Sequence, residues 1–455
     1  MRTRFFRIIA ALWLGSFVST ALAAPDIQQW WTPNGVRVLF VQDDILPMLD
    51  VRVLFDAASS RDDGLPGLAA LTNGLLAEGA AGKSAQQIAE DFESVGANID
   101  NAALRDMAYV GVRTLTRERY LDRAMTTLAE VLTQPDFPPQ AFERELARMK
   151  VARQASKQSP SDIAEEAFYK ALYRDHPYAT PVGGTDASLA AITLDDVHAF
   201  YRKYYVAGNA LVVMVGAVDR AQAQTIATKL TAALPAGQKP ASLPPVPELT
   251  EAKTIRIEFP SKQSNILVGQ PGMTRGDPDY FALYVANHPL GGSGFSSRLV
   301  QTIREDRGLA YSVYSYFTPM REAGPFTMGM QTRADQTDEA LSLMNTELEK
   351  YVSAGPTQAE LDAAKSNITG SFPLGLDSNS KLLGYLAMIG FYDLPLDYIE
   401  TFIDHVRAVD LKAVNDVLKR RLHPDRMLTV IVGKGAGEDA GESASTRSQP
   451  AHESG

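Results

Sequence analysis

The sequence contains no cysteine, and it has only six histidines and three tryptophans among its 455 residues. Without cysteine the chain forms no disulfide, no thiolate metal site, no thiol nucleophile and no c-type haem attachment. A chain of this length is nevertheless long enough to build two hydrophobic cores of ordinary size. The fold must therefore be stabilised by packing and hydrogen bonding alone.

Basic residues are also in deficit, because 44 lysines and arginines face 54 aspartates and glutamates, for a formal net charge of −10. This balance excludes nucleic acid as an expected partner and disfavours contact with anionic membranes. The histidines are too scattered for a helical metal site, in which two ligands stand four residues apart. They are His176, His198, His288, His405, His423 and His452.

Long apolar runs are missing except near the start. Residues 1–23 carry three arginines, an apolar stretch over residues 8–18 and a final Ala21-Leu22-Ala23. This pattern predicts a cleaved signal peptide, since the apolar stretch is too short for a comfortable membrane span. We expect export to a bacterial periplasm without membrane insertion. The polar segment 435–455 lacks periodicity and predicts a disordered tail.

Strand-like and helical patterns alternate twice along the rest of the chain. The two blocks are residues 24–234 and 251–434, and a segment rich in proline and alanine, 235–250, predicts the linker between them. A helix–strand unit ending at Gly216 aligns without a gap on one ending at Gly433. We therefore expect an α/β fold of two homologous domains, each a mixed, largely antiparallel sheet packed with helices.

Capping boxes predict two of the helix starts in these blocks. Ser84 with Gln87 should open one helix, and Thr357 with Glu360 should open another. The long polar–apolar periodicity between residues 118 and 171 predicts helices over most of that interval.

The stretch from residue 290 to residue 314 combines a glycine turn, an amphipathic segment and an aromatic strand. Gly291, Gly292 and Gly294 give the turn backbone freedom. Ser296 or Ser297 can cap the helix that follows, whose apolar stripe comprises Leu299, Val300 and Ile303. Gly308 ends this helix, and the alternating aromatic residues after it predict a strand.

Arg304 and Tyr311 stand seven residues apart within this stretch. Both side chains donate hydrogen bonds, so a fold that unites them in a cleft could hold a peptide carbonyl or a developing oxyanion. On residue types alone, a surface arginine and a half-buried core tyrosine are the favoured interpretation.

The run from Gly294 to Val313 resembles the second-domain signature of the pitrilysin/insulinase family of zinc metallopeptidases, in its processing-peptidase branch. The resemblance implies two domains enclosing a clam-shell cleft and a peptide or unfolded polypeptide as substrate. It also implies that Arg304 and Tyr311 complete the catalytic site from the domain opposite the zinc. The glycines at 291, 292 and 294 would then shape the peptide cleft.

The zinc motif that this resemblance leads us to expect in the first domain is absent. Its pattern H-x-x-E-H places two zinc ligands and a general base on one helix face. The matching positions here are Ala70, Asn73 and Gly74, and a third ligand position falls near Val151 or Ala152. Alanine and glycine lack a ligand atom, and a neutral amide does not take a proton from water at neutral pH. We expect no metal in this chain.

Two hypotheses remain open from the sequence. The chain is either the zinc-free subunit of a heteromeric peptidase, whose partner carries the intact motif and the zinc, or a non-catalytic structural or peptide-binding scaffold. If the cleft takes basic peptides, the negative net charge predicts carboxylates along it.

Overall fold

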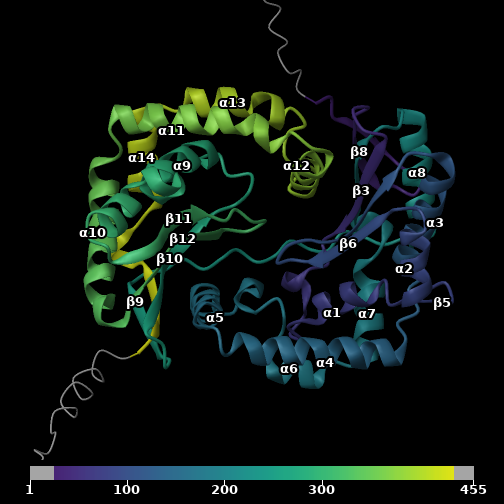
Figure 1. Ribbon diagram of the computed structural model, residues 1–455, viewed down its shortest axis with the longest axis horizontal. Helices are drawn as coiled ribbons and strands as arrows, with labels where there is room; N and C mark the ends of the chain where they lie inside the picture. Colours follow the sequence, from purple (N-terminus) through teal and green to yellow (C-terminus); the bar gives the residue numbers. More distant parts are fainter. Residues whose placement is uncertain (1–24, 435–455) are drawn as a thin grey trace, which may run out of the picture.

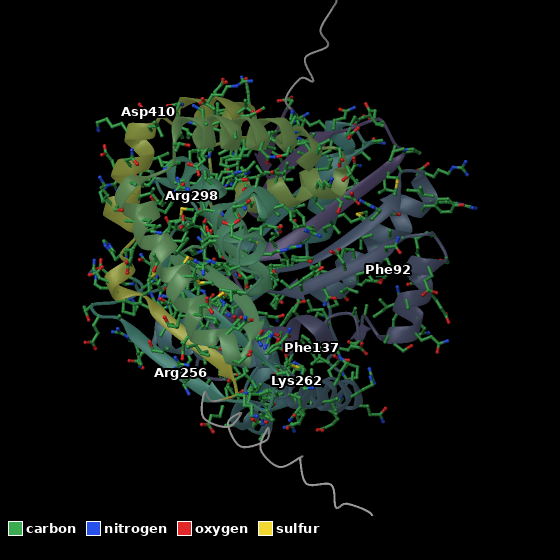
Figure 2. The ribbon with its side chains drawn as sticks, turned by 60° about the vertical axis from the view of Figure 1, so that its left-hand side comes forward. Phe92, Phe137, Arg256, Lys262, Arg298 and Asp410 are labelled. Carbon is green, nitrogen blue, oxygen red and sulfur yellow. The ribbon has the colours of Figure 1, made fainter. Side chains whose placement is uncertain are left out.

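The computed structural model describes residues 25–434, so the predicted signal peptide 1–23 and tail 435–455 lie outside the described residues. The chain forms two halves, each with a mixed sheet and flanking helices (Figure 1). Phe92 and Phe137 mark the core of the N-terminal half (Figure 2). No helix between residues 25 and 434 combines the length and apolar character needed to cross a bilayer.

The N-terminal sheet has six strands in the order β1-β2-β8-β3-β7-β6. Strands β2 and β8 run parallel, and the other neighbours in this sheet run antiparallel. The bounds are β1 Gln28–Trp31, β2 Arg37–Gln42, β3 Met48–Phe55, β6 Asn98–Ala103, β7 Ala108–Leu115 and β8 Ala210–Gly216. A two-residue hairpin, β4 Gly79–Ala80 and β5 Lys83–Ser84, stands apart from it.

The C-terminal sheet has five strands in the order β11-β12-β10-β13-β9. Here β13 and β9 run parallel, and the other neighbours run antiparallel. The bounds are β9 Lys253–Glu258, β10 Gln263–Met273, β11 Ala310–Phe317, β12 Gly324–Arg333 and β13 Leu428–Gly433.

The two sheets share one strand order. Starting from the parallel pair, β2-β8-β3-β7-β6 in the first half corresponds to β9-β13-β10-β12-β11 in the second. The aligned glycines end equivalent strands for a shared steric reason. A Cβ on Gly216 would lie 2.2 Å from the carbonyl oxygen of Met48, and one on Gly433 would lie 2.4 Å from Oγ of Ser264. The predicted α/β fold of two mixed, largely antiparallel domains is confirmed.

Helices cover both sheets, and the two predicted capping boxes are present at the starts of α2 and α11. In the N-terminal half the bounds are α1 Leu68–Leu75, α2 Ala85–Glu93, α3 Glu118–Thr133, α4 Pro139–Ser156, α5 Pro160–Tyr173, α6 Asp186–Ala191, α7 Leu194–Tyr204 and α8 Arg220–Thr231. In the C-terminal half they are α9 Tyr280–Asn287, α10 Thr337–Ala354, α11 Gln358–Ser371, α12 Asn379–Phe391, α13 Tyr398–Ala408 and α14 Leu411–Arg421.

Each half lends one helix to the sheet of the other half. Helix α5 packs on the C-terminal sheet, where Phe168 and Leu172 share a buried cluster with Val430 of β13. Helix α12 packs on the N-terminal sheet against β3 and β8. Figure 1 shows α5 beside β10 and α12 beside β3 and β8. Apolar faces of both sheets are therefore buried only when the two halves are together.

The segment 235–250, predicted as a linker, contains no helix or strand, yet it is held in place. Leu243 and Leu249 are buried in the cluster that α5 forms with the C-terminal sheet. The guanidinium of Arg61 donates to the carbonyl oxygen of Ala241 at 2.8 Å.

A buried carboxylate also joins the halves. Asp106, on the turn between β6 and β7, is 4 % exposed. It accepts hydrogen bonds from the phenol of Tyr178 at 2.5 Å, the phenol of Tyr392 at 3.0 Å and the backbone N–H of Arg321 at 2.7 Å. Two of these three donors belong to the other half, so opening the halves would leave Asp106 under-bonded.

We predict that Gly390→Leu destabilises the chain by about 1–3 kcal/mol, the usual cost of overpacking a core. A Cβ on Gly390 would lie 2.6 Å from Cδ2 of Leu211 and 2.9 Å from Cδ1 of Leu39, so a larger side chain forces α12 off the N-terminal sheet. Urea unfolding would measure the loss. The matched control is Gly370→Leu on α11, whose Cβ meets nothing within 4 Å. Equal stability of the two variants would contradict the role given to α12.

Candidate functional site

The segment between α9 and β11, which contains the glycines, forms three short helical turns in succession. A π-helical turn covers His288–Gly292, a 3-10 turn covers Gly294–Ser296 and a second π-helical turn covers Val300–Glu305. The predicted amphipathic helix is thus mostly a π-turn, although Leu299, Val300 and Ile303 are buried as its stripe requires. π-Turns are uncommon and are often found at functional sites.

Two glycines and one serine give this turn its shape. Gly291 passes so close to β11 that a Cβ would lie 2.4 Å from the backbone nitrogen of Ser315. Gly294 has a φ of +61°, which favours glycine. Ser297, one of the two predicted caps, donates from its hydroxyl to the carbonyl oxygen of Gly294 at 2.8 Å and accepts from the N–H of Val300 at 3.4 Å.

Arg304 and Tyr311 lie together, as the donor-pair hypothesis requires. The guanidinium carbon of Arg304 is 5.1 Å from the ring centre of Tyr311 and 4.9 Å from that of Phe295. Its Nε lies 3.3 Å from the carboxylate of Glu305. Tyr311 is 83 % exposed, so its phenol faces solvent and not a core. The alternative of a half-buried core tyrosine is wrong.

A strand irregularity turns Tyr311 outward. The pairing of β11 with β12 shifts between Ala310 and Ser312, which leaves Tyr311 without a partner in β12. Strict alternation would put Tyr311 on the same side as the buried Val313. The bulge instead places Tyr311 on one pocket with Tyr314 and Tyr316, in keeping with the use of bulges to redirect side chains.

This pocket, which we call the Arg304 pocket, has a volume of about 590 Å³. Gly291, Gly292 and Gly294 line it beside the two donors, and the remaining lining residues are Tyr284, Asn287, His288, Phe295, Val300, Ser312, Val313, Tyr314, Ser315 and Tyr316. No carboxylate lines it. The aromatic rings favour apolar or aromatic side chains of a bound peptide.

Three other titratable groups of the pocket have pKa shifts that favour their neutral forms. Burial raises the pKa of Tyr314 and of Tyr316, whose rings stack with centres 5.3 Å apart. Burial lowers the pKa of His288, whose Nε2 lies 3.1 Å from Oδ1 of Asn367. Arg304 is therefore the only charged side chain among the residues that line the Arg304 pocket.

The positions matching the lost zinc motif lie on α1 and are filled by a structural network. Asn73 is 1 % exposed, and its amide nitrogen donates to the carbonyl oxygen of Tyr109 at 3.2 Å and to the phenol of Tyr205 at 3.3 Å. Its amide oxygen accepts from Asn101 at 3.0 Å. Ala70 and Gly74 contribute no ligand atom, so the site does not fit a metal.

One carboxylate near this position was not expected from the sequence. A Cβ on Gly74 would lie 4.0 Å from Oε2 of Glu145, which is 9 % exposed on α4. Arg148 holds that carboxylate with an Nη2–Oε2 distance of 2.6 Å. Glu145 lies far from α1 in the sequence, so no local pattern indicates this contact. The spacing of the motif points to Val151 or Ala152 instead.

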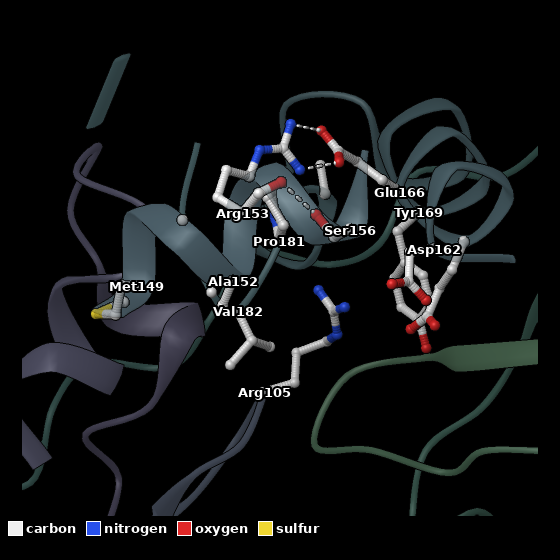
Figure 3. Close-up of a pocket in the computed structure, with 14 residues that line it drawn as sticks. Arg105, Met149, Ala152, Arg153, Ser156, Asp162, Glu166, Tyr169, Pro181 and Val182 are labelled. Atoms are coloured by element: carbon white, nitrogen blue, oxygen red, sulfur yellow. Dashed lines mark hydrogen bonds and ion pairs between the residues drawn. The ribbon is translucent and has the colours of Figure 1, made fainter. Parts of the chain in front are cut away.

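Neither Val151 nor Ala152 supplies a ligand atom. Val151 is 71 % exposed. Ala152 lines a separate pocket of about 330 Å³ between α4 and α5, shown in Figure 3 with the ion pair of Arg153 and Glu166. Within residues 25–434 no group of three or more histidines, aspartates and glutamates is placed to hold a metal ion.

Arg298, another arginine of the stretch 290–314, anchors this stretch to the helices of the C-terminal half (Figure 2). Its Nε and Nη2 donate to the two carboxylate oxygens of Glu360 at 2.6 Å and 2.7 Å, and its guanidinium carbon lies 4.9 Å from the ring centre of Tyr351. Arg298 and a bond from the N–H of Thr357 lower the pKa of Glu360 to about 2. Arg298 is therefore structural, whereas Arg304 lines the open pocket and has one ion-pair contact among the described residues, with its neighbour Glu305.

The Arg298–Glu360 pair predicts a defined pH dependence of stability. Because the pKa of Glu360 is depressed in the folded chain, its contribution is complete above its ordinary value of 4.5 and is lost as the pH falls toward 2. We expect Arg298→Gln to remove about 1–2 kcal/mol at pH 7, and less at pH 3. Urea unfolding at both pH values measures this difference. Arg407→Gln, in an exposed pair, is the control, and a loss independent of pH would contradict the assignment.

Two regions of the chain, which together cover most of its length, match two domains of one peptidase family. Residues 37–186 match "Insulinase (Peptidase family M16)", and residues 191–368 match "Peptidase M16 inactive domain". The crystal structure of a peptidase M16 inactive domain from Pseudomonas fluorescens superposes with a TM-score of 0.87 at 40 % sequence identity. The alignment covers 90 % of this chain and 98 % of that one.

Two curated relatives are similar along almost their whole length. The "Non-peptidase homolog YmxG" of Helicobacter pylori is 28 % identical, over 94 % of this chain and 98 % of that protein. The "Uncharacterized zinc protease YmxG" of Bacillus subtilis is 26 % identical, over 90 % of this chain and 99 % of that protein. With the strand order and the Arg304 pocket described above, these matches show that the chain belongs to the M16 (pitrilysin/insulinase) peptidase family, as a member whose zinc motif is replaced.

Proposed function

We propose that this chain is the zinc-free subunit of a heteromeric periplasmic metalloendopeptidase that acts on peptides or unfolded polypeptides. The observation that carries the proposal is the contrast between two sites. Arg304 and Tyr311 stand together at an open pocket, whereas Asn73 is locked into a buried network. A second subunit of the same family with an intact H-x-x-E-H motif would supply the zinc and the general base.

The chemistry of the Arg304 pocket is that of hydrogen-bond donation to a peptide bond. A guanidinium offers several N–H donors and a phenol offers one O–H, which suits a carbonyl oxygen that gains negative charge during hydrolysis. Strand β11 is an edge strand, paired only with β12. An extended peptide could therefore lie along it with side chains among Phe295 and Tyr316, which are 74 % and 45 % exposed.

The second candidate is a structural or peptide-binding scaffold without a catalytic role. The filled metal position supports it, as does the name "Non-peptidase homolog" borne by the Helicobacter pylori relative. A scaffold needs the peptide groove but not the donors, so substitution of the donors separates the two candidates.

We predict that the purified chain retains no stoichiometric zinc after dialysis and cleaves no unfolded polypeptide by itself, since Ala70, Asn73 and Gly74 replace the ligands and the base. Metal analysis and a casein digestion assay measure this. Thermolysin, a zinc peptidase, serves as positive control for both measurements. One tightly held zinc per chain, together with cleavage that a chelator inhibits, would contradict the proposal.

In a complex reconstituted with a zinc-bearing family subunit, we predict that Tyr311→Phe lowers kcat about 10²–10³-fold, the usual cost of one lost oxyanion donor. The ring remains, so assembly should survive and KM should change less than kcat. Arg304→Ala should lower kcat/KM, and the double variant should lose less than the sum if both donors serve one carbonyl.

Tyr120→Phe on α3 is the control, because it removes a phenol that lies outside the Arg304 pocket. Size-exclusion chromatography verifies that each complex is intact. Unchanged turnover in Tyr311→Phe and Arg304→Ala, with intact complexes, would favour the scaffold.

A further inference from the structure

A second pocket of about 460 Å³ lies in the C-terminal half, among the helices α9, α11, α12 and α13 that gather in the upper part of Figure 1. We call it the Arg275 pocket. Tyr284 lines both this pocket and the Arg304 pocket, and no other residue does. Its lining residues are Arg275, Tyr280, Tyr284, Ile368, Ser371, Phe372, Gly375, Lys381, Gly384, Tyr385, Met388, Tyr398 and Phe402.

Arg275 enters this pocket without an anionic partner. Its Nε is buried and unbonded, and within residues 25–434 its side chain donates no hydrogen bond and has no carboxylate within 4 Å. Arg61, Arg298 and Arg421, which are also shielded, each grip a carboxylate with two nitrogens. Because its Nε is shielded from water without an acceptor, and no carboxylate engages its guanidinium, Arg275 is the candidate anion-binding group of this pocket.

The walls around Arg275 are mainly aromatic. The rings of Tyr280 and Tyr284 stack with centres 5.9 Å apart, and those of Phe372 and Phe402 stack at 4.1 Å. The guanidinium carbon of Arg275 lies 6.0 Å from the ring centre of Tyr280. Burial raises the pKa of Tyr385, and the charge of Arg275 opposes that shift.

The charged side chains that line the pocket are both cations, Arg275 and Lys381. No carboxylate lines it. Lys381 also lines the pocket, and its Nζ lies 2.8 Å from the carboxylate of Asp377 and 2.8 Å from the carbonyl oxygen of Leu374. Lys381 is thus satisfied by the protein, and Arg275 is the cation left for a ligand.

We propose that the Arg275 pocket binds a small amphipathic carboxylate, with its apolar body among the aromatic rings and its carboxylate on Arg275. The volume falls in the range of roughly 300–1,000 Å³ common for small-molecule sites. A planar guanidinium matches a carboxylate with two parallel hydrogen bonds. A free aromatic or aliphatic acid and the C-terminal residue of a peptide share this chemistry.

A ligand in this pocket would contact α12, the helix that packs on the N-terminal sheet. Lys381, Gly384, Tyr385 and Met388 recur on α12 at the spacing of one helix face, and they face the pocket. Another face of α12 packs on the N-terminal sheet at Gly390. A bound acid would therefore brace the helix that joins the halves, and should raise the melting temperature of the chain.

Isothermal titration of the purified chain with N-acetylphenylalanine tests the proposal, with N-acetylphenylalaninamide as the neutral probe. We expect saturable binding of the acid, about ten-fold or more weaker after Arg275→Gln, because a hydrogen bond to a charged group is lost. The amide should bind the variant and the original chain alike. Arg407→Gln, on the exposed face of α13, is the matched control.

A blocking variant locates the site. A Cβ on Gly384 or on Gly370 meets nothing within 4 Å, and both glycines lie in helices, but only Gly384 lines the pocket. Gly384→Leu should abolish binding of acid and amide, while Gly370→Leu should leave both unchanged. N-acetyl-Ala-Ala-Phe distinguishes the two sources, since tighter binding than N-acetylphenylalanine indicates a peptide terminus and equal binding a free acid.

No saturable binding of either acid, or full binding by Gly384→Leu, would overturn the site. Equal affinity of Arg275→Gln and the original chain would overturn the assignment of the carboxylate to Arg275. These outcomes are independent of Tyr311 and of any peptidase partner, so they leave the proposed function untouched.

Discussion

The exchange of helices between the halves is the constraint on which the rest of the structure depends. Helix α5 buries Phe168 against the C-terminal sheet, and α12 packs Gly390 against the N-terminal one. Each sheet thus has an apolar face that its own half does not cover. The Arg304 pocket and the filled zinc position, which lie in different halves, keep their relative places because these two helices hold the halves together.

The two positions that match the family's catalytic site differ in how their side chains are engaged. At Asn73 the ligands are gone, and an amide network with Asn101 and Tyr205 satisfies the buried polar groups. A half-satisfied network in that position would be more costly than an apolar one, so its complete bonding stabilises α1. At Arg304 and Tyr311 the reverse holds, since solvent exposure and a strand bulge keep both donors available.

Local sequence patterns were sufficient for much of the fold and for part of the site. The capping boxes at Ser84 and Thr357 specify helix starts through contacts within four residues, and both are present. The spacing of Arg304 and Tyr311, read with the family resemblance, identified the pair that shares the pocket. The alternation of side chains along β11 predicts the wrong side for Tyr311. The bulge that turns this residue outward depends on the pairing with β12, and the residues of β11 alone do not indicate it.

The sequence by itself determined the absence of thiol chemistry, the loss of the zinc motif at Ala70, Asn73 and Gly74, and the repetition of one α/β unit, because each depends on residue identity or near neighbours. Only the tertiary structure decided which surfaces surround the donors. The uncharged aromatic walls of the Arg304 pocket, the approach of Glu145 to Gly74 and the unpaired Arg275 are set by contacts between segments far apart in the chain. Net charge averages over the whole surface, whereas a pocket reflects only the few side chains that packing brings together.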